Sequence, residues 1–182
     1  MKASPRERLL AAAAAILSRD GYAKLTMERV SHESGVAKTT LYRHWPTKSN
    51  LCMDLYLHAA AGELRDPDTG DVTLDLKKIA GTVIRLQTRT SAGPAFIGLI
   101  AEAHESPKVF SEFAKRRRVL TRKVLQRGID RGQLRRDTDV DLVIDALGGA
   151  VTFRVLQRHA PLDKRFVESL VNLILNGCRR KT

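Results

Sequence analysis

The 182-residue sequence has only two cysteines, Cys52 and Cys178, which stand far apart and belong to no partner motif. This spacing argues against a disulfide framework and fits a reducing cytosol, where both would act as small buried hydrophobic residues. No apolar run approaches the roughly 20 residues that cross a bilayer, and the N-terminus shows no signal-peptide cleavage pattern. We therefore expect a cytoplasmic protein, with an interchain bridge through Cys178 as a minor alternative.

Motifs for catalysis, metal binding and cofactor binding are also missing. The sequence has no glycine-rich phosphate loop ending in Lys and Ser or Thr, no Gly-x-Gly-x-x-Gly and no Cys-x-x-Cys. His104 is followed by Glu105, but the second histidine that a zinc-binding helix needs one turn later is absent. The sequence thus predicts no catalytic residue, no metal and no cofactor. A ligand-binding helical enzyme stays an alternative, because histidines that are distant in sequence can still converge in space.

What the sequence has in excess is positive charge. It contains 32 Lys and Arg against 20 Asp and Glu, a formal net charge of +12. Such a field attracts nucleic acid first and an anionic membrane surface second. The charge indicates a polyanionic partner without locating the binding site.

Helix signals recur from end to end and strand alternation is absent, which predicts an all-α fold of about nine helices. Ser4 and Glu7 form an expected capping box at the start of the first helix, and Gly21 ends it. The further expected helices are 27–34, 37–45, 48–61, 74–87, 94–104, 107–132, 140–158 and 164–177. The turn-rich stretch 62–72 between the fourth and fifth helices is the clearest break in composition.

The second and third helices carry the sharpest signal, a helix-turn-helix pattern. Gly35 can take the positive φ that a tight turn between helices needs, and Ser31 is small enough for the helices to approach closely. Val30, Val36 and Leu41 are spaced to form a small core between them. This arrangement leaves the second helix of the pair free to enter the major groove of DNA.

Exposed positions of that helix carry side chains suited to DNA. Lys38, Thr39 and Thr40 lie in its first turn, where such helices contact base edges with hydroxyl, methyl and ammonium groups. Other polar side chains nearby are expected to hold backbone phosphates, and Trp45 to pack against the first and fourth helices. The alternative is that Leu41, Tyr42 and Trp45 are all simply core. The predicted DNA-binding set is Thr26, Lys38, Thr39, Thr40, Tyr42, Arg43, His44 and Lys48.

The stretches 25–30 (LTMERV) and 35–45 (GVAKTTLYRHW), followed by Lys48, resemble the tetracycline-repressor (TetR) family over about residues 5–55. Ser31 and Ser34 stand where alanines are usual, and we expect the two extra hydroxyls to loosen the packing of the second helix. The resemblance implies an N-terminal three-helix DNA-binding domain, 1–47, and an effector-binding and dimerisation domain, 48–182. The helix 48–61 is expected to connect the two domains.

The resemblance also implies that the last two helices build a four-helix bundle across a dimer axis. Helix 140–158 has two apolar stripes, one beginning at Leu142 and one at Val143, and a helix with two apolar faces is buried between layers. The alternative is that both helices only fill the core of one protomer. The predicted interface residues are Val143, Leu147, Val151, Leu170 and Ile174.

An effector pocket among the fifth to eighth helices is implied in the same way. Arg117 lies within an apolar stripe and His104 at the edge of another, so we hypothesise that both anchor an acidic or acceptor group of the ligand. Glu102 and Glu105 are candidate internal partners for Arg117. The alternative is that Arg117 reaches solvent and His104 is a core histidine with satisfied hydrogen bonds. The predicted pocket residues are Val83, Phe96, Ile100, His104, Phe110, Phe113, Arg117 and Leu120.

These features together predict a sequence-specific transcriptional regulator without enzymatic activity. The resemblance makes a repressor the expected form: a homodimer on a palindromic operator, released by a small molecule. The alternative is a protein that coats DNA through charge alone, but such a protein needs no reading helix.

Overall fold

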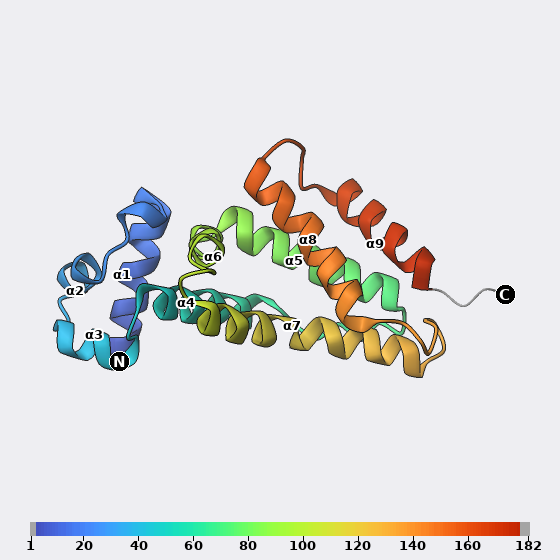
Figure 1. Cartoon of the computed structure of the whole chain (residues 1–182), viewed down its shortest axis with the longest axis horizontal. Coiled ribbons are helices and arrows are strands. Elements are labelled where there is room, and N and C mark those ends of the chain that lie inside the picture. The colour runs from blue at the N-terminus through green and yellow to red at the C-terminus, as the bar shows by residue number, and fades with distance from the viewer. Residues whose placement is uncertain (1–2, 179–182) are drawn as a thin grey trace. The chain divides into compact units, whose positions relative to one another are not determined.

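The computed structural model describes residues 3–178 (Figure 1). Within this range the chain forms nine α-helices, one short 3₁₀ helix and no strand, which confirms the all-α prediction. The first helices are α1 (Pro5–Asp20), α2 (Met27–Ser34), α3 (Lys38–His44) and α4 (Lys48–Glu63). They are followed by α5 (Val72–Arg89), α6 (Ala92–Ala101), α7 (Pro107–Asp130), α8 (Val140–Gln157) and α9 (Lys164–Cys178).

The helices divide into two compact units, which we describe separately. The first unit contains residues 3–62 and 86–114, and the second contains residues 63–85 and 115–178. Helices α5 and α7 therefore contribute residues to both units. Across residues 3–178, every helix is either too short or too polar to span a membrane.

The capping box at the start of α1 is confirmed. The Ser4 hydroxyl accepts a hydrogen bond from the backbone N–H of Glu7 at 3.2 Å, and the Glu7 carboxylate accepts one from the backbone N–H of Ser4 at 2.7 Å. Each group satisfies a donor that the first turn of a helix leaves unpaired. The 3₁₀ turn Tyr22–Lys24, which links α1 to α2, was not predicted from the sequence.

In the core of the first unit, an aromatic cluster lies between α4, α6 and α7, each of which contributes one ring. The ring centroid of Tyr56 lies 5.7 Å from that of Phe96 and 5.0 Å from that of Phe113, and Phe96 and Phe113 are 6.0 Å apart. All three side chains are fully buried. Aromatic pairs at these spacings add stability beyond the area that they bury.

Helix α6 ends earlier than the predicted residue 104. Residues 102–105 form turns, in which the N–H of Ala103 bonds to the carbonyl of Ile100 and that of Glu105 to the carbonyl of Glu102. These bonds span three residues instead of the four of an α-helix, so the helix tightens and stops. The spacing of apolar residues in the sequence could not predict where α6 ends.

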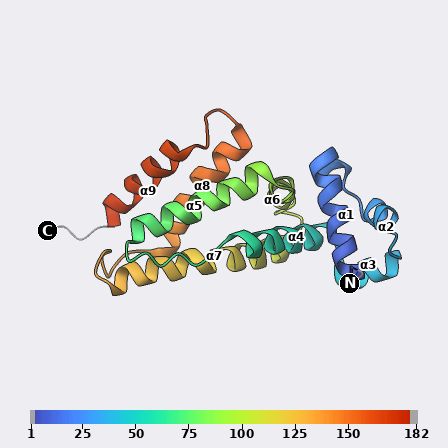
Figure 2. The ribbon, with the colours of Figure 1, turned by 180° about the vertical axis from the view of Figure 1, so that it is seen from behind.

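In the second unit, α8 and α9 lie side by side, as the two opposite views show (Figures 1 and 2). The backbone N–H of Arg135, in the turn after α7, donates to the carbonyl of Cys178 at the end of α9. The loop 64–71 is held to α7 by acidic side chains: Arg127 pairs with Asp66 at 2.9 Å, and Arg131 pairs with Asp68 at 2.7 Å.

Candidate nucleic-acid interface

The turn between α2 and α3 is closed by a left-handed glycine and by hydroxyl groups. Gly35 has φ +64°, as expected, and this conformation is strained for residues with a Cβ. The Ser31 hydroxyl donates to the carbonyl of Val36 at 2.6 Å, and the Ser34 hydroxyl donates to the carbonyl of Ser31 at 3.1 Å. Ser34 also accepts from the N–H of Val36 at 3.2 Å. The expectation that these hydroxyls loosen α2 is therefore wrong: they fasten its C-terminal turn.

Behind this turn, a small apolar core fixes the two helices. Val30, Val36 and Leu41 are buried, as predicted. Trp45 is also buried, and its side chain contacts groups from α1 and α4 rather than solvent. The prediction that Trp45 packs against the first and fourth helices is confirmed, and the alternative that Tyr42 is core is wrong because Tyr42 is exposed.

Ion pairs hold α2 against α1. Arg29 pairs with Glu33 on its own helix at 2.8 Å and also with Asp20 at the end of α1. Arg19 pairs with Glu33 at 2.9 Å, so two arginines and two carboxylates form one network. The hydrogen bond from Arg29 holds the pKa of Glu33 below its usual value, and the bond from Arg19 does the same for Asp20.

The polar side chains of α3 are available to a partner. Lys38, Thr39, Arg43 and His44 are exposed, Tyr42 is 43% exposed, and Thr40 is half-buried.

Across the α3 face lies a carboxylate of α2. Oε1 of Glu28 is 3.5 Å from the Lys38 ammonium and 3.5 Å from the Tyr42 hydroxyl. Both Lys38 and Glu28 are exposed, so this ion pair is weak and can exchange for another anion.

Two members of the predicted set have other contacts in the structure. The Thr26 hydroxyl caps α2 by accepting from the N–H of Arg29 at 3.2 Å. The Lys48 ammonium is turned toward the first unit's interior, 3.3 Å from the carbonyl of Tyr22 and 3.6 Å above the centre of its ring. The same ammonium lies 3.7 Å from Oε1 of Glu102, in the turn after α6. From the sequence, Glu102 was a candidate partner for Arg117, and no sequence signal linked it to Lys48.

Comparisons with known proteins identify this architecture. Residues 9–53 match the profile of bacterial regulatory proteins of the tetR family, and residues 66–174 match the tetracyclin repressor-like C-terminal domain. The chain belongs to the TetR family. The HTH-type transcriptional regulator AqdR of Rhodococcus erythropolis is 32% identical over 94% of this chain and 84% of its own.

Two further TetR-family proteins extend the match. A DNA-binding transcriptional repressor TetR of Mycobacteroides abscessus is 31% identical over 92% of this chain and 90% of its own. The crystal structure of the TetR-family regulator SCO0332 superimposes with a TM-score of 0.81 at 38% identity, over 97% of this chain and 99% of the other. TetR-family proteins are DNA-binding helix-turn-helix regulators, so this chain is a transcriptional regulator and not an enzyme.

The effector residues predicted from the TetR resemblance separate into interior and surface positions. Phe96 and Phe113 lie in the aromatic cluster, and Phe110 is 6.3 Å from Phe113, whereas Ile100 is half-buried. His104 is exposed in the turn after α6, so it is neither an interior anchor nor a core histidine. The prediction failed because it extended α6 through this residue. Val83, Arg117 and Leu120 belong to the second unit, where each is partly exposed.

Gln87, near the end of α5, was missed by the sequence analysis. It is only 5% exposed, yet neither its side-chain nitrogen nor its side-chain oxygen has a hydrogen-bond partner among residues 3–178. Buried polar groups are normally paired, because an unpaired one costs about 1–3 kcal/mol. Gln87 lies beside the apolar stripe of α5, and nothing in the sequence indicated that its amide would be buried.

The predicted dimer residues also need correction. Val143, Leu147, Val151 and Leu170 are buried by their own chain, and only Ile174 keeps partial exposure. The other stripe of α8 faces outward: Leu142 is 64% exposed and Phe153 is 58% exposed. Helical periodicity predicted both stripes but could not decide which one packs within the protomer.

Proposed function

We propose that this TetR-family regulator is a cytoplasmic homodimeric repressor that binds a palindromic operator through α3 and leaves it when a small molecule binds. The single observation that carries the proposal of DNA binding is the exposed polar face of α3, whose opposite face packs on a buried apolar core. Lys38 and Thr39 on this face are both exposed. Polar side chains so placed match the base-reading positions of a recognition helix.

Dimer formation is supported by the apolar surface that α8 and α9 leave open. Leu142, Phe153 and Leu156 on α8 and Leu173 on α9 are between 43% and 74% exposed. An exposed apolar surface of this kind is unfavourable in water and marks a contact site. A twofold dimer would present two α3 helices to half-sites roughly 34–36 Å apart, which a single module cannot do.

Effector binding is supported by the buried amide of Gln87, which has no hydrogen-bond partner among residues 3–178. Gln87 belongs to the first unit, as does the cluster of Tyr56, Phe96 and Phe113. An amide offers one acceptor oxygen and two N–H donors. A mainly apolar ligand with a carboxyl, hydroxyl or amide group would satisfy it, and few convergent polar groups in an apolar site are typical of ligand pockets.

The test is selection of bound sequences from a random duplex library by the purified protein, followed by sequencing. We expect an enriched palindrome, bound in the presence of excess random duplex at moderate salt. Binding without enrichment that disappears as salt rises would contradict operator recognition and favour the DNA-coating alternative, because non-specific binding is almost wholly electrostatic. A double variant, Lys38→Ala with Thr39→Ala, should lose the enrichment and keep its fold.

A further inference from the structure

The turn after α6 reaches the first residues of α4 through one carboxylate. Oε2 of Glu102 accepts a hydrogen bond from the Ser49 hydroxyl at 2.5 Å, and Oε1 lies 3.7 Å from the Lys48 ammonium. Ser49 is 2% exposed, and the side chains of Lys48 and Glu102 are 24% and 28% exposed. All three residues belong to the first unit. The contact is therefore largely shielded from water, which strengthens it relative to a surface ion pair.

The position of Glu102 is set by how α6 packs on the turn between α1 and α2. A Cβ added at Gly98 would lie 2.0 Å from Cε2 of Tyr22, so the ring rests directly on the α6 backbone. The same ring forms one face of the site that holds the Lys48 ammonium, at 3.6 Å. A shift of α6 relative to Tyr22 would thus change the surroundings of Lys48 from two directions.

Glu102 is charged at neutral pH. Burial acts to raise the pKa of Glu102, but the hydrogen bond from Ser49, the Tyr22 hydroxyl and the positive charge of Lys48 together outweigh burial and hold this pKa below its usual value. A charged carboxylate and a DNA phosphate are equivalent partners for an ammonium group, because each offers anionic acceptor oxygens. The Lys48 ammonium is turned toward the interior of the first unit, so a phosphate that drew it outward would lengthen its contact with Glu102.

We propose that Glu102 competes with a backbone phosphate of the operator for Lys48 and thereby lowers the DNA affinity of the free protein. The proposal rests on the proposed function, since it needs Lys48 to meet phosphate when DNA binds. In the free protein the Lys48 ammonium is held by Glu102, by the backbone carbonyl of Tyr22 and by the face of the Tyr22 ring. On DNA it exchanges Glu102 for phosphate, and any displacement of the α6 turn shifts this exchange.

The first experiment measures operator affinity of Glu102→Gln over a range of salt concentrations, with the duplex that the wild-type protein selects. Glutamine keeps the shape of the side chain and can still accept the bond from Ser49, so the fold should persist. We expect binding to be tighter by at least about twofold to fivefold, which is the ratio that a surface ion pair gives. Lys48 meets the phosphate in both complexes, so the salt dependence of log K should stay close to that of the wild-type protein.

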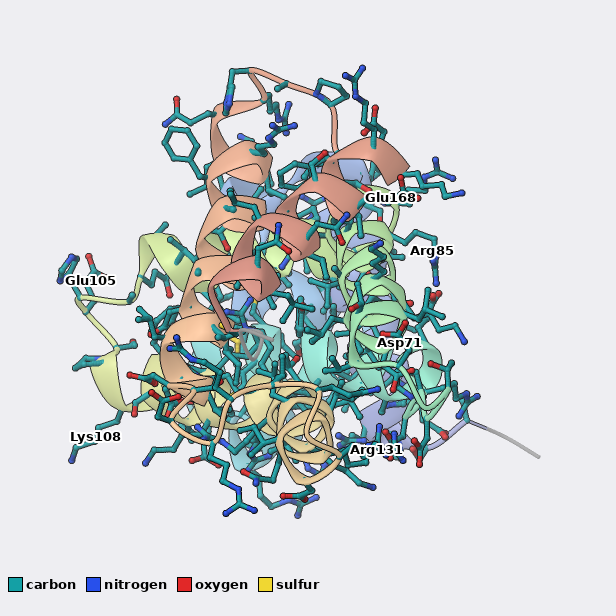
Figure 3. The ribbon with its side chains drawn as sticks, turned by 90° about the vertical axis from the view of Figure 1, so that its right-hand side faces the viewer. Asp71, Arg85, Glu105, Lys108, Arg131 and Glu168 are labelled. Carbon is teal, nitrogen blue, oxygen red and sulfur yellow. The ribbon has the colours of Figure 1, made fainter. Side chains whose placement is uncertain are left out.

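The matched control is Glu105→Gln, which removes the same charge from the same turn. Glu105 is exposed and projects outward (Figure 3), and among residues 3–178 it has no side-chain ion pair. This control should change affinity only slightly and leave the salt slope unchanged. Equal effects of Glu102→Gln and Glu105→Gln would overturn the proposal, because a general charge effect would then explain both.

A double-mutant cycle separates competition from a structural role. Lys48→Ala should weaken binding and flatten the salt slope, and adding Glu102→Gln to Lys48→Ala should give no further gain. A gain that persists without Lys48 would overturn the competition. Specific wild-type binding combined with failure of the cycle refutes this inference alone, whereas absence of specific binding by the wild-type protein refutes the proposed function and the inference with it.

Discussion

The indole N–H of Trp45 donates a hydrogen bond to Oδ2 of Asp54 over 2.9 Å, and Arg6 donates to the same oxygen over 2.6 Å. One carboxylate on α4 therefore connects the start of α1 with the residue that ends α3. Trp45 is 4% exposed, so its N–H has little access to water if this acceptor is removed. The position of the recognition helix consequently depends on a side chain that does not itself contact DNA in the proposed complex.

Replacing Asp54 should destabilise the protein through this lost acceptor. Asp54→Ala is expected to lower the free energy of unfolding by about 1–3 kcal/mol, the cost of a buried unsatisfied donor. Asp54→Asn should cost less, because its amide oxygen can still accept from the indole and the Arg6 pair is partly exposed. Urea denaturation followed by Trp45 fluorescence measures both variants. Equal losses would indicate that the ion pair, and not the indole bond, provides the stability.

The base-reading role of α3 can be tested at Thr40. Thr40→Ala removes a hydroxyl and keeps the chain's charge, so we expect relaxed preference at one position of each half-site, worth about 1 kcal/mol. The salt dependence should stay that of the wild-type protein. Affinities for cognate and scrambled duplexes provide the measurement. An equal loss on both duplexes would remove Thr40 from the base-reading set.

Local features of the fold were predictable because short-range chemistry determines them. Ser4 and Glu7 cap each other within one turn, and Gly35 is required by the backbone conformation of the turn that it occupies. Lys38 and Thr39 are polar and lie on the helix that carries the core residue Leu41, so they could be assigned to the exposed face of that helix in the same way. These inferences need only the periodicity of one helix and the chemistry of its ends.

Contacts between distant residues could not be predicted in this way. Lys48 and Glu102 are separated by more than fifty positions, and the packing of α6 on Tyr22 helps to bring them together. On α8, the stripe that contains Val143 packs inside the protomer and the stripe that contains Leu142 faces outward. Both stripes have the same helical periodicity in the sequence, so only the tertiary structure shows which of them is covered.

The packing of α6 on Tyr22 predicts a strong effect of a single methyl group. Gly98→Ala would place Cβ against the ring of Tyr22, and we expect a loss of about 1–3 kcal/mol in the free energy of unfolding from overpacking. Gly81→Ala in α5 is the matched control, because nothing lies within 4 Å of the added Cβ. It should stabilise by up to about 1 kcal/mol through helix propensity. Thermal melts that show equal stability for the two variants would contradict this packing.

The two cysteines should differ in reactivity. Burial raises the pKa of Cys52 to about 12, so its reactive thiolate is nearly absent at about pH 8. Burial also raises the pKa of Cys178, but this thiol is partly exposed. A Cys178→Ser variant treated with a thiol-specific disulfide reagent should therefore not react until guanidinium unfolds it. The reverse variant, Cys52→Ser, should react in the native state, and rapid reaction of native Cys178→Ser would show that Cys52 is accessible.

Leu173 tests whether α8 and α9 form the dimer contact. It is 74% exposed, so Leu173→Glu should leave the stability of one protomer nearly unchanged, while a carboxylate at the centre of an apolar interface would remain buried and unpaired. We expect sedimentation to show a monomer at concentrations where the wild-type protein is a dimer, with loss of operator binding in parallel. Leu74→Glu introduces the same change at a 49% exposed leucine on α5 and should remain dimeric. A dimeric Leu173→Glu would move the interface away from this surface, because no dimer that encloses Leu173 could accommodate the charge without a large loss of affinity.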